Sequence, residues 1–447
     1  MLHRRILKLT PEALWVFTEQ TGVAIAAFVG IKLLTHVLDT SEFGRLALAN
    51  TIVMLIGTSS FGPLGQGLLR FWAISKEHGE LHTFYRVSNR IAIYAVIASL
   101  LLAVIFSCSI SIVKGFDWTM LVMLSSGVGI ITGLFGLKVS VFTAARQRRR
   151  TALLRVSNSF LRPLCALLLI VLTVPLANMA LVGYLVTIVI VFVIARGLYN
   201  RETLKKCSSS RVDVRSASFQ SLRKEIWKYA WPFLAWAGFG WIHLSCDKWS
   251  LQAFHGAKVV GAFAVVSSLS IYPLVFGSGF LTTLFTPIAF QRAGDLSQSQ
   301  SVSSANKTLL LMTGIYIVGA VIIISVFSLL HQPLVLLVSN ERFVQYSYLL
   351  PWLTLAWALF YLGQLLICWG LLAKQARSYI LPKLVCSMVA FLGTFSLSAS
   401  MGPMGIVLGL GIAGAIYAVW CGMIALKLLR TRRKSPWSAN SIRYGAS

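Results

Sequence analysis

The chain alternates long apolar segments with short basic loops, and this alternation restricts its possible folds more than any other feature. A helix needs about 20 mostly apolar residues to cross a bilayer. Segments of this kind lie at approximately 18–38, 46–72, 90–113, 118–142, 153–175, 177–198, 228–247, 259–290, 308–330, 345–373, 379–399 and 403–427. Because lipid offers no hydrogen bonds to the backbone, the pattern predicts an all-α integral membrane protein with about twelve transmembrane helices.

The basic residues give the predicted orientation. With both termini in the cytoplasm, 31 of the 40 Lys and Arg residues fall on the cytoplasmic side, as the positive-inside rule requires. Five fall outside: Arg45, Lys114, Lys248, Lys258 and Arg342. The net charge of +27 is spread over many short loops, which predicts contact with anionic lipid headgroups and argues against nucleic-acid binding.

The chain shows no pattern of residues for catalysis or metal binding. Its seven cysteines include no CxxC pair, and the P-loop, HExxH and GxSxG motifs are missing. We therefore expect no enzymatic activity, no cofactor and no metal site. None of the 13 acidic residues is placed at mid-membrane, with Asp247 assigned to the outer end of the seventh segment. A proton or sodium antiporter usually needs such a carboxylate.

The chain divides near its middle. We predict a six-helix bundle over 1–200, a cytoplasmic linker over 201–227, a second six-helix bundle over 228–430 and a basic cytoplasmic tail over 431–447. The halves share a faint pattern, with Gly44 and Gly261 at matching places between the first and second helix of each half. Parallel repeats of this kind enclose a substrate cavity in transporters.

Glycine and proline recur in the second helix of each half, and we expect them to bend it. A proline in a membrane helix frees a backbone carbonyl and favours a kink. The residues concerned are Gly62, Pro63 and Gly65 in the first half and Pro273 and Gly277 in the second.

Three stretches carry a resemblance to a known family. They are LDTSEFGR with FGPLG at 38–65, WPF through DK to GAF at 231–263, and the glycine-rich hairpin GPMGI through GA at 402–415. On them the chain resembles the polysaccharide and O-antigen flippases, in the superfamily that also holds the multidrug-and-toxin extruders (MATE). The resemblance implies a MATE-like fold around a central cavity, and alternating-access passage of a polyprenyl-pyrophosphate-linked glycan. Some relatives have fourteen helices, where this chain has twelve.

Four cations inside the apolar segments are candidate substrate ligands: Lys32, Arg70, Lys138 and Arg162. Arg162 lies about 13 Å into its segment, near the midplane, and Lys32 about 21 Å into its own. We expect them to bind the pyrophosphate of a lipid-linked sugar, because guanidinium matches phosphate oxygens in a bidentate pair. The alternatives are snorkelling for Arg70, Lys138 and Lys32, and a structural hydrogen bond beside Pro163 for Arg162.

Two tryptophans, Trp236 and Trp241, lie too deep for an interfacial belt. We expect them to offer flat apolar faces to sugar rings, with packing against lipid as the alternative.

The resemblance, together with these patterns, implies a flippase for lipid-linked oligosaccharide, such as an O-antigen or exopolysaccharide repeat unit, in the bacterial inner membrane. A drug or metabolite antiporter of the same fold is the first alternative. A polysaccharide polymerase or ligase is the second, although the external loops are too short to hold a catalytic domain. A polymerase or glycosyltransferase partner, the glycan and the energy source stay open.

Overall fold

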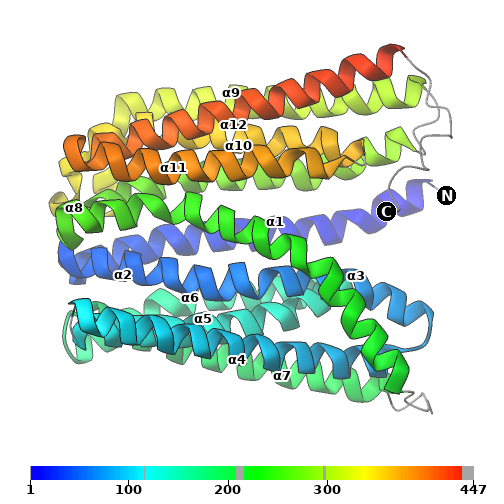
Figure 1. Ribbon diagram of the computed structural model, residues 1–447, viewed down its shortest axis with the longest axis horizontal. Coiled ribbons are helices and arrows are strands. Elements are labelled where there is room, and N and C mark those ends of the chain that lie inside the picture. The colour runs from blue at the N-terminus through cyan, green and yellow to red at the C-terminus, as the bar shows by residue number, and fades with distance from the viewer. Residues whose placement is uncertain (1, 115, 208–215, 295–298, 374, 435–447) are drawn as a thin grey trace. The chain divides into compact units, whose positions relative to one another are not determined.

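The computed structural model describes residues 2–114, 116–207, 216–294, 299–373 and 375–434, and these ranges are helical with no β-strand (Figure 1). The chain forms two compact units. The first comprises Met1–Ala264 with Leu336–Phe343, and the second comprises Val265–Val335 with Val344–Ser447. The segment 336–343 therefore belongs to the first unit although the residues on both sides of it belong to the second.

The first unit is built from long helices that pack side by side. In order they are α1 (Leu2–Val37), α2 (Thr40–Met54), the π-helical turn η1 (Leu55–Ser60), α3 (Gly62–Glu77), α4 (Leu81–Lys114), α5 (Phe116–Ala144), α6 (Arg148–Leu172) and α7 (Ala177–Cys207). Helix α6 packs against both α1 and α7, and α5 packs against α4 and α7. Helix α8 (Ser216–Ala293) begins in this unit and ends in the second.

The second unit continues with α9 (Ser299–Val338), the 3-10 segment η2 (Glu341–Leu349), α10 (Leu350–Leu372), the 3-10 turn η3 (Ala376–Tyr379), α11 (Ile380–Met401) and α12 (Pro403–Lys434). Helix α12 packs against both α10 and α11. Its hairpin with α11 turns at Gly402, whose φ of 60° is a conformation that glycine adopts without a steric penalty.

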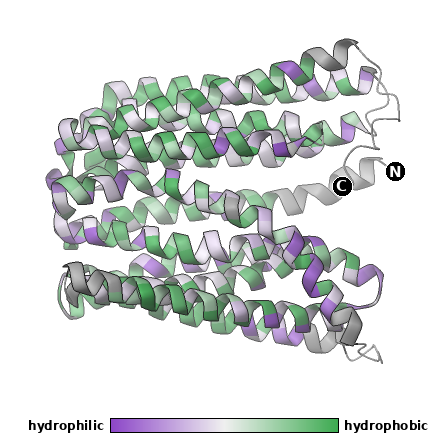
Figure 2. Ribbon diagram, viewed as in Figure 1, coloured by the Kyte–Doolittle hydropathy of each residue, from purple (hydrophilic) through white to green (hydrophobic). Residues whose placement is uncertain are grey.

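Eleven helical stretches among the described residues are long and apolar enough to span a membrane. The longest, 74 residues, contains one break, at Gly256 (φ 78°, ψ 173°). An unbroken helix of that length would extend roughly 110 Å, far beyond the hydrocarbon core of a bilayer, so its two arms are separate crossings. Apolar residues line most of the helix lengths (Figure 2). The all-α, twelve-crossing membrane fold predicted from the sequence is confirmed.

The break in the second crossing lies at the predicted glycine and proline residues. The π-helical turn η1 ends at Ser60, Phe61 interrupts the helix, and α3 restarts with Gly62, Pro63 and Gly65 in its first turn. Proline suits the first turn of a helix because no intrahelical partner awaits its missing N–H. That these residues bend during function stays a prediction.

In the second half the observed break is at Gly256. Helix α8 is continuous through Pro273 and Gly277 to Ala293. The turn between the two arms requires a positive φ, which residues other than glycine rarely adopt. Gly256 supplies it. A bending role for Pro273 and Gly277 stays a prediction.

The two glycines that match in sequence also meet in space. Helix α2 crosses the start of the second arm of α8 so closely that a methyl group on Gly44 would collide with the carbonyl oxygen of Ala257. A methyl group on Gly261 would likewise collide with the carbonyl oxygen of Thr40. Small residues at membrane helix crossings allow this backbone approach. The crossing fixes α2 against α8 at one end of the first unit.

The described helices extend into the predicted linker and tail. Helix α7 continues to Cys207, α8 starts at Ser216, and α12 continues to Lys434. The rest of both segments, 208–215 and 435–447, lies outside the described residues. The division into bundles over 1–200 and 228–430 stays a prediction, because the compact units divide after Ala264.

The glycine crossing predicts a sharp difference between two otherwise similar substitutions. Gly44→Ala should lower the unfolding free energy by about 1–3 kcal/mol, the usual effect of overpacking. Gly197→Ala, in an exposed part of α7 with nothing within 4 Å of the new methyl group, should be neutral or slightly stabilising. Thermal unfolding of the purified proteins in detergent measures both. Equal midpoints for the two variants would show that α2 and α8 do not cross in this way.

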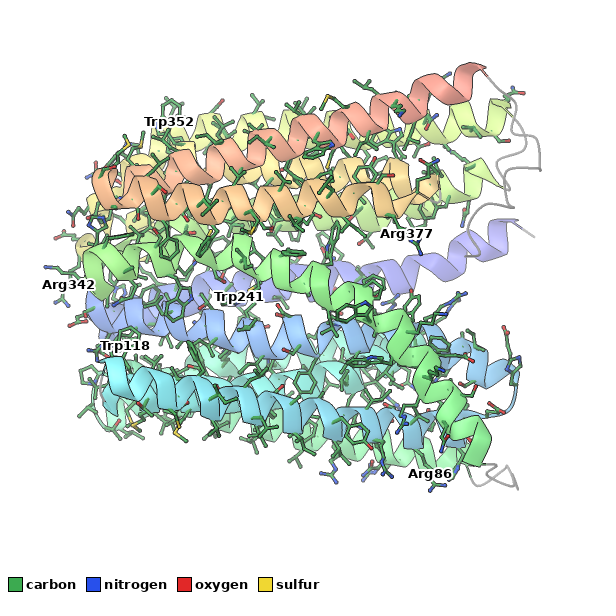
Figure 3. The ribbon with its side chains drawn as sticks, in the orientation of Figure 1. Arg86, Trp118, Trp241, Arg342, Trp352 and Arg377 are labelled. Atoms are coloured by element: carbon green, nitrogen blue, oxygen red, sulfur yellow. The ribbon has the colours of Figure 1, made fainter. Side chains whose placement is uncertain are left out.

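The charge pattern predicts which end of the first unit faces outside. Arg342 and Arg86 are both exposed and lie at opposite ends of that unit (Figure 3). By the positive-inside rule, a cysteine replacing Arg342 should react with an impermeant maleimide added to whole cells, and one replacing Arg86 should not. The reverse labelling pattern would show that the topology is opposite to the one predicted.

Candidate functional site

Arg162 lies near the middle of α6 and is half-buried within the first unit. Its Nη2 donates a hydrogen bond to Oδ1 of Asn50 on α2 at 2.7 Å. Its Cζ lies 4.0 Å from the ring centroid of Tyr184 on α7, a distance at which a cation and an aromatic face attract each other. Both of these groups are neutral, so these contacts orient the guanidinium without cancelling its charge.

Lys138 on α5 has the same pair of neighbours. Its Nζ donates to Oδ1 of Asn89 on α4 at 2.8 Å and lies 3.6 Å from the ring centroid of Tyr199 on α7. An asparagine oxygen and a tyrosine ring thus hold the cation at both sites. Arg70, by contrast, is exposed on α3, which agrees with the snorkelling alternative.

The ammonium group of Lys32 meets the end of another helix. Its Nζ donates to the carbonyl oxygens of Leu336 at 3.1 Å and Ser339 at 2.9 Å, at the C-terminus of α9. The last carbonyls of a helix have no intrahelical donor, and a cation there satisfies them and the helix dipole. Pairing of Lys32 with a pyrophosphate stays a prediction, and the observed contacts are with backbone.

A cavity of about 860 Å³ lies in the first unit, and its lining includes Trp249 together with Trp118 and Trp241, which are labelled in Figure 3. Thr51 orients two of these indoles, because its carbonyl oxygen accepts from Trp241 Nε1 at 2.7 Å and its Oγ1 accepts from Trp249 Nε1 at 2.9 Å. The other lining residues are Ile52, Leu55, Ile56, Ser60, Ser99, Leu102, Ala103, Phe106, Ser126, Gln252 and Ala253. These side chains are mostly apolar and uncharged, so the cavity suits an apolar ligand surface.

The sequence predicts Trp241 as a candidate site residue but does not indicate Trp249. The two are eight residues apart, which places both on nearly the same face of a helix, and that spacing was the available signal. Trp236 is half-buried on the same arm of α8 and is not among the residues that line the cavity. Stacking of Trp236 or Trp241 on a sugar stays a prediction.

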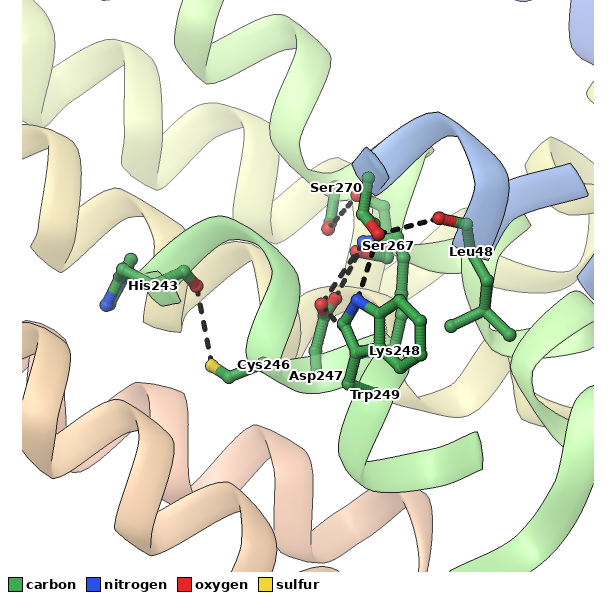
Figure 4. A network of polar contacts seen from close by, with 9 residues as sticks. Leu48, His243, Cys246, Asp247, Lys248, Trp249, Ser267 and Ser270 are labelled. Carbon is green, nitrogen blue, oxygen red and sulfur yellow. Dashed lines mark hydrogen bonds and ion pairs between the residues drawn. The ribbon is translucent and has the colours of Figure 1, made fainter. Parts of the chain in front are cut away.

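The position predicted for Asp247 needs correction. The first arm of α8 continues to Gly256, so Asp247 lies about 13 Å before the end of that arm. Asp247 is fully buried. By hydropathy the apolar segment ends at the charged pair Asp247–Lys248, although apolar residues resume after it. Lys248 Nζ lies 3.0 Å from Oδ2 and 3.2 Å from Oδ1 of Asp247, which neutralises the carboxylate (Figure 4).

Two further carboxylates in membrane-crossing helices also lie beside cations. Glu42 is 3.1 Å from Arg45 and also accepts a hydrogen bond from the backbone N–H of Ala177. Glu19 is 2.7 Å from Arg155. These ion pairs place compensated acidic groups in the first unit.

One buried cation was missed by the sequence argument. Lys383 on α11 is 3% exposed, and its Nζ lies 4.0 Å from the ring centroid of Phe360 on α10 and 5.4 Å from that of Tyr417 on α12. Its place near the start of the eleventh segment had assigned it to the cytoplasmic charges. The signal was a single lysine within an apolar run, and the aromatic rings that cover it come from other helices.

The comparisons with known proteins fit this geometry. The model of the family described as polysaccharide biosynthesis protein matches residues 9–291. The chain belongs to this family. No curated protein sequence matches the chain significantly.

Solved structures share the fold over almost the whole chain. The lipid II flippase MurJ in an inward closed conformation matches with a TM-score of 0.68 and 12% identity, covering 95% of this chain and 91% of that one. The eukaryotic MATE transporter AtDTX14 matches with 0.64 and 17% identity, covering 96% and 98%. A MOP superfamily transporter from Pyrococcus furiosus, whose structure is described as having a binding pocket of reverse polarity, matches with 0.54 and 15%, covering 93% and 95%. At these identities the likeness establishes the MATE-like fold.

The contacts of Thr51 predict a measurable energetic coupling. Thr51→Val removes the hydroxyl that accepts the Trp249 N–H and should lower the unfolding free energy by about 1–3 kcal/mol. Adding Trp249→Phe should recover part of that loss, because no buried donor is then left without an acceptor. Thermal unfolding in detergent measures the cycle, with Thr18→Val on the exposed side of α1 as the matched control. Additive effects in the double variant would argue against the hydrogen bond.

Proposed function

We propose that the protein carries a polyprenyl-pyrophosphate-linked oligosaccharide from the cytoplasmic to the outer face of the bacterial inner membrane by alternating access. The substrate is an O-antigen or exopolysaccharide repeat unit, both termini are cytoplasmic, and the lipid tail stays in the bilayer. The observation that carries the proposal is Arg162, a cation near the middle of a membrane-crossing helix, held by Asn50 and Tyr184 in a chain of the polysaccharide biosynthesis family.

The location of Arg162 supports a functional role because a cation at the centre of a membrane helix is disfavoured by about 2.5–3.5 kcal/mol. Its neutral neighbours fix the guanidinium in place. A guanidinium presents planar N–H donors that match phosphate oxygens two at a time. Lys138, held in the same manner by Asn89 and Tyr199, supplies a second positive charge in the proposal.

The alternative of a cationic-drug antiporter has less support. Such a transporter needs an acidic group for its substrate or coupling ion, and the buried carboxylate of Asp247 is already paired with Lys248. The MATE neighbours share the fold with this chain, which does not decide between the two substrates. Extrusion of cationic dyes from proteoliposomes, without movement of lipid-linked sugar, would favour the antiporter.

A polymerase or ligase activity is likewise not part of the proposal. Family and fold neighbours are biosynthesis proteins and transporters. The purified protein should leave lipid-linked sugar at its original chain length, as judged by gel analysis. A longer glycan chain produced by the isolated protein would establish an enzyme.

Charge substitutions at the Arg162 site test the proposal. Asn50→Asp is nearly isosteric and puts a carboxylate where an amide oxygen now lies 2.7 Å from Arg162 Nη2. It should cancel the charge that the substrate needs and reduce surface polysaccharide at least about tenfold, as should Arg162→Gln. Arg162→Lys should restore little, because an ammonium group lacks the planar fork.

The assay is complementation of a flippase-null strain, with the amount of membrane-inserted protein checked by immunoblot. Arg201→Gln, which removes an exposed cation of α7, is the matched control and should complement fully. Normal surface polysaccharide from Arg162→Gln at normal protein level would remove Arg162 from the mechanism.

A further inference from the structure

A short segment formed by the end of α9 and the start of η2 is attached to the rest of the first unit at several points. Residues 336–343, which we call the strap, are part of that unit, while Val335 and Val344 on either side belong to the second. Lys32 Nζ donates hydrogen bonds to the carbonyl oxygens of Leu336 and Ser339. The strap is therefore a covalent link between the units that is fastened to α1.

Two further contacts fasten the strap. Asn340 Nδ2 donates to the carbonyl oxygen of Thr35 on α1. The ring of Phe343 packs edge-on against Phe43 of α2, with centroids 5.4 Å apart and planes at 79°. Thr35 and Phe343 are 0% exposed and Ser339 is 1% exposed, while Lys32, Leu336 and Asn340 are half-buried, so these contacts are partly shielded from water. Hydrogen bonds from a charged donor are strong in such surroundings.

The helical backbone is broken on both sides of the strap. Leu330 in α9 departs from helical geometry with φ −121° and ψ 21°, three residues before Pro333. Tyr346 in η2 departs from it with φ −106° and ψ 15°. Breaks in a helix at a proline or at an element end are where the φ/ψ changes of a hinge are usually absorbed.

From these contacts we propose that Lys32 is a positioning residue that anchors the strap on α1 throughout the transport cycle, so that the second unit pivots at Leu330 and Tyr346. The proposal rests on alternating access, as set out under the proposed function. The attachment consists of three part-buried hydrogen bonds and one aromatic contact, whereas the flanking breaks already lack regular helical geometry. A movement between the units that bends the chain at the two breaks therefore loses fewer contacts than a movement that detaches the strap.

This role differs from substrate binding by Lys32, and labelling separates the two without any transport assay. In a background with the seven native cysteines replaced, Ser339→Cys places a thiol on the strap itself, at a position that is buried while the strap is docked on the first unit. Lys32→Met keeps the side-chain length but cannot donate, and should speed labelling by an impermeant maleimide at least about tenfold. Lys32→Arg keeps the donors and should label as slowly as the parent. Equal labelling rates in the Lys32→Met variant and the parent would show that Lys32 does not anchor the strap.

A cross-link then tests whether the strap stays attached during transport. Thr35→Cys and Asn340→Cys are joined by a short bifunctional methanethiosulfonate reagent in proteoliposomes that contain lipid-linked repeat units extracted from a flippase-null strain. With Lys32 present, the cross-linked protein should transport at the rate of the uncross-linked pair. A block of transport would show that the strap must detach, which overturns the proposal.

The same cross-link should rescue the loss of Lys32. Lys32→Met alone should lose transport, and Lys32→Met with the cross-link should regain most of it, because the covalent bond replaces the anchor. No rescue would mean that Lys32 acts elsewhere and would overturn its anchoring role in transport. If the parent protein moves no lipid-linked sugar, the proposed function fails, and the labelling rates still decide whether Lys32 anchors the strap.

Discussion

A polar group inside a bilayer must find its partner within the protein, because the hydrocarbon core supplies none. The contacts of the first unit follow from this constraint. Asn50 takes the guanidinium N–H of Arg162, and Thr51, the next residue on α2, takes the indole N–H groups of Trp241 and Trp249. One turn of α2 thereby ties together α6 and the first arm of α8, and the same residues position both the candidate cation and the wall of the cavity.

The acidic and basic groups of the membrane helices find different kinds of partner within the protein. Asp247 meets a lysine next to it in sequence, and Glu42 meets an arginine three residues away, so these acids are compensated locally. The guanidinium of Arg162 and the ammonium group of Lys138 are each oriented by a hydrogen bond to an asparagine side-chain oxygen and by an aromatic face. Under the proposed function, these oriented cations would meet an anionic substrate. The pyrophosphate of a lipid-linked sugar has that charge.

Errors in the sequence argument came from treating each apolar segment separately. Hydropathy ends the seventh segment at Asp247 because a charged pair interrupts it, whereas the helix continues for two more turns, since Asp247 is buried and paired with Lys248. Lys383 was assigned to a loop because it lies near a segment end, whereas rings from α10 and α12 cover it. In both cases another charge or another helix compensates a polar group that hydropathy counts as exposed.

The sequence by itself determined the class of the protein, the number of crossings, most of the cations that lie within them and the resemblance to the flippase family. Hydropathy suffices for these because a bilayer imposes the same length and polarity on every crossing. Only the tertiary structure decided the partners. Arg162 meets Asn50, 112 residues away, and Lys32 meets the carbonyl of Ser339, 307 residues away. Partners so distant along the chain are set by which helix faces pack together, and no local pattern records that choice.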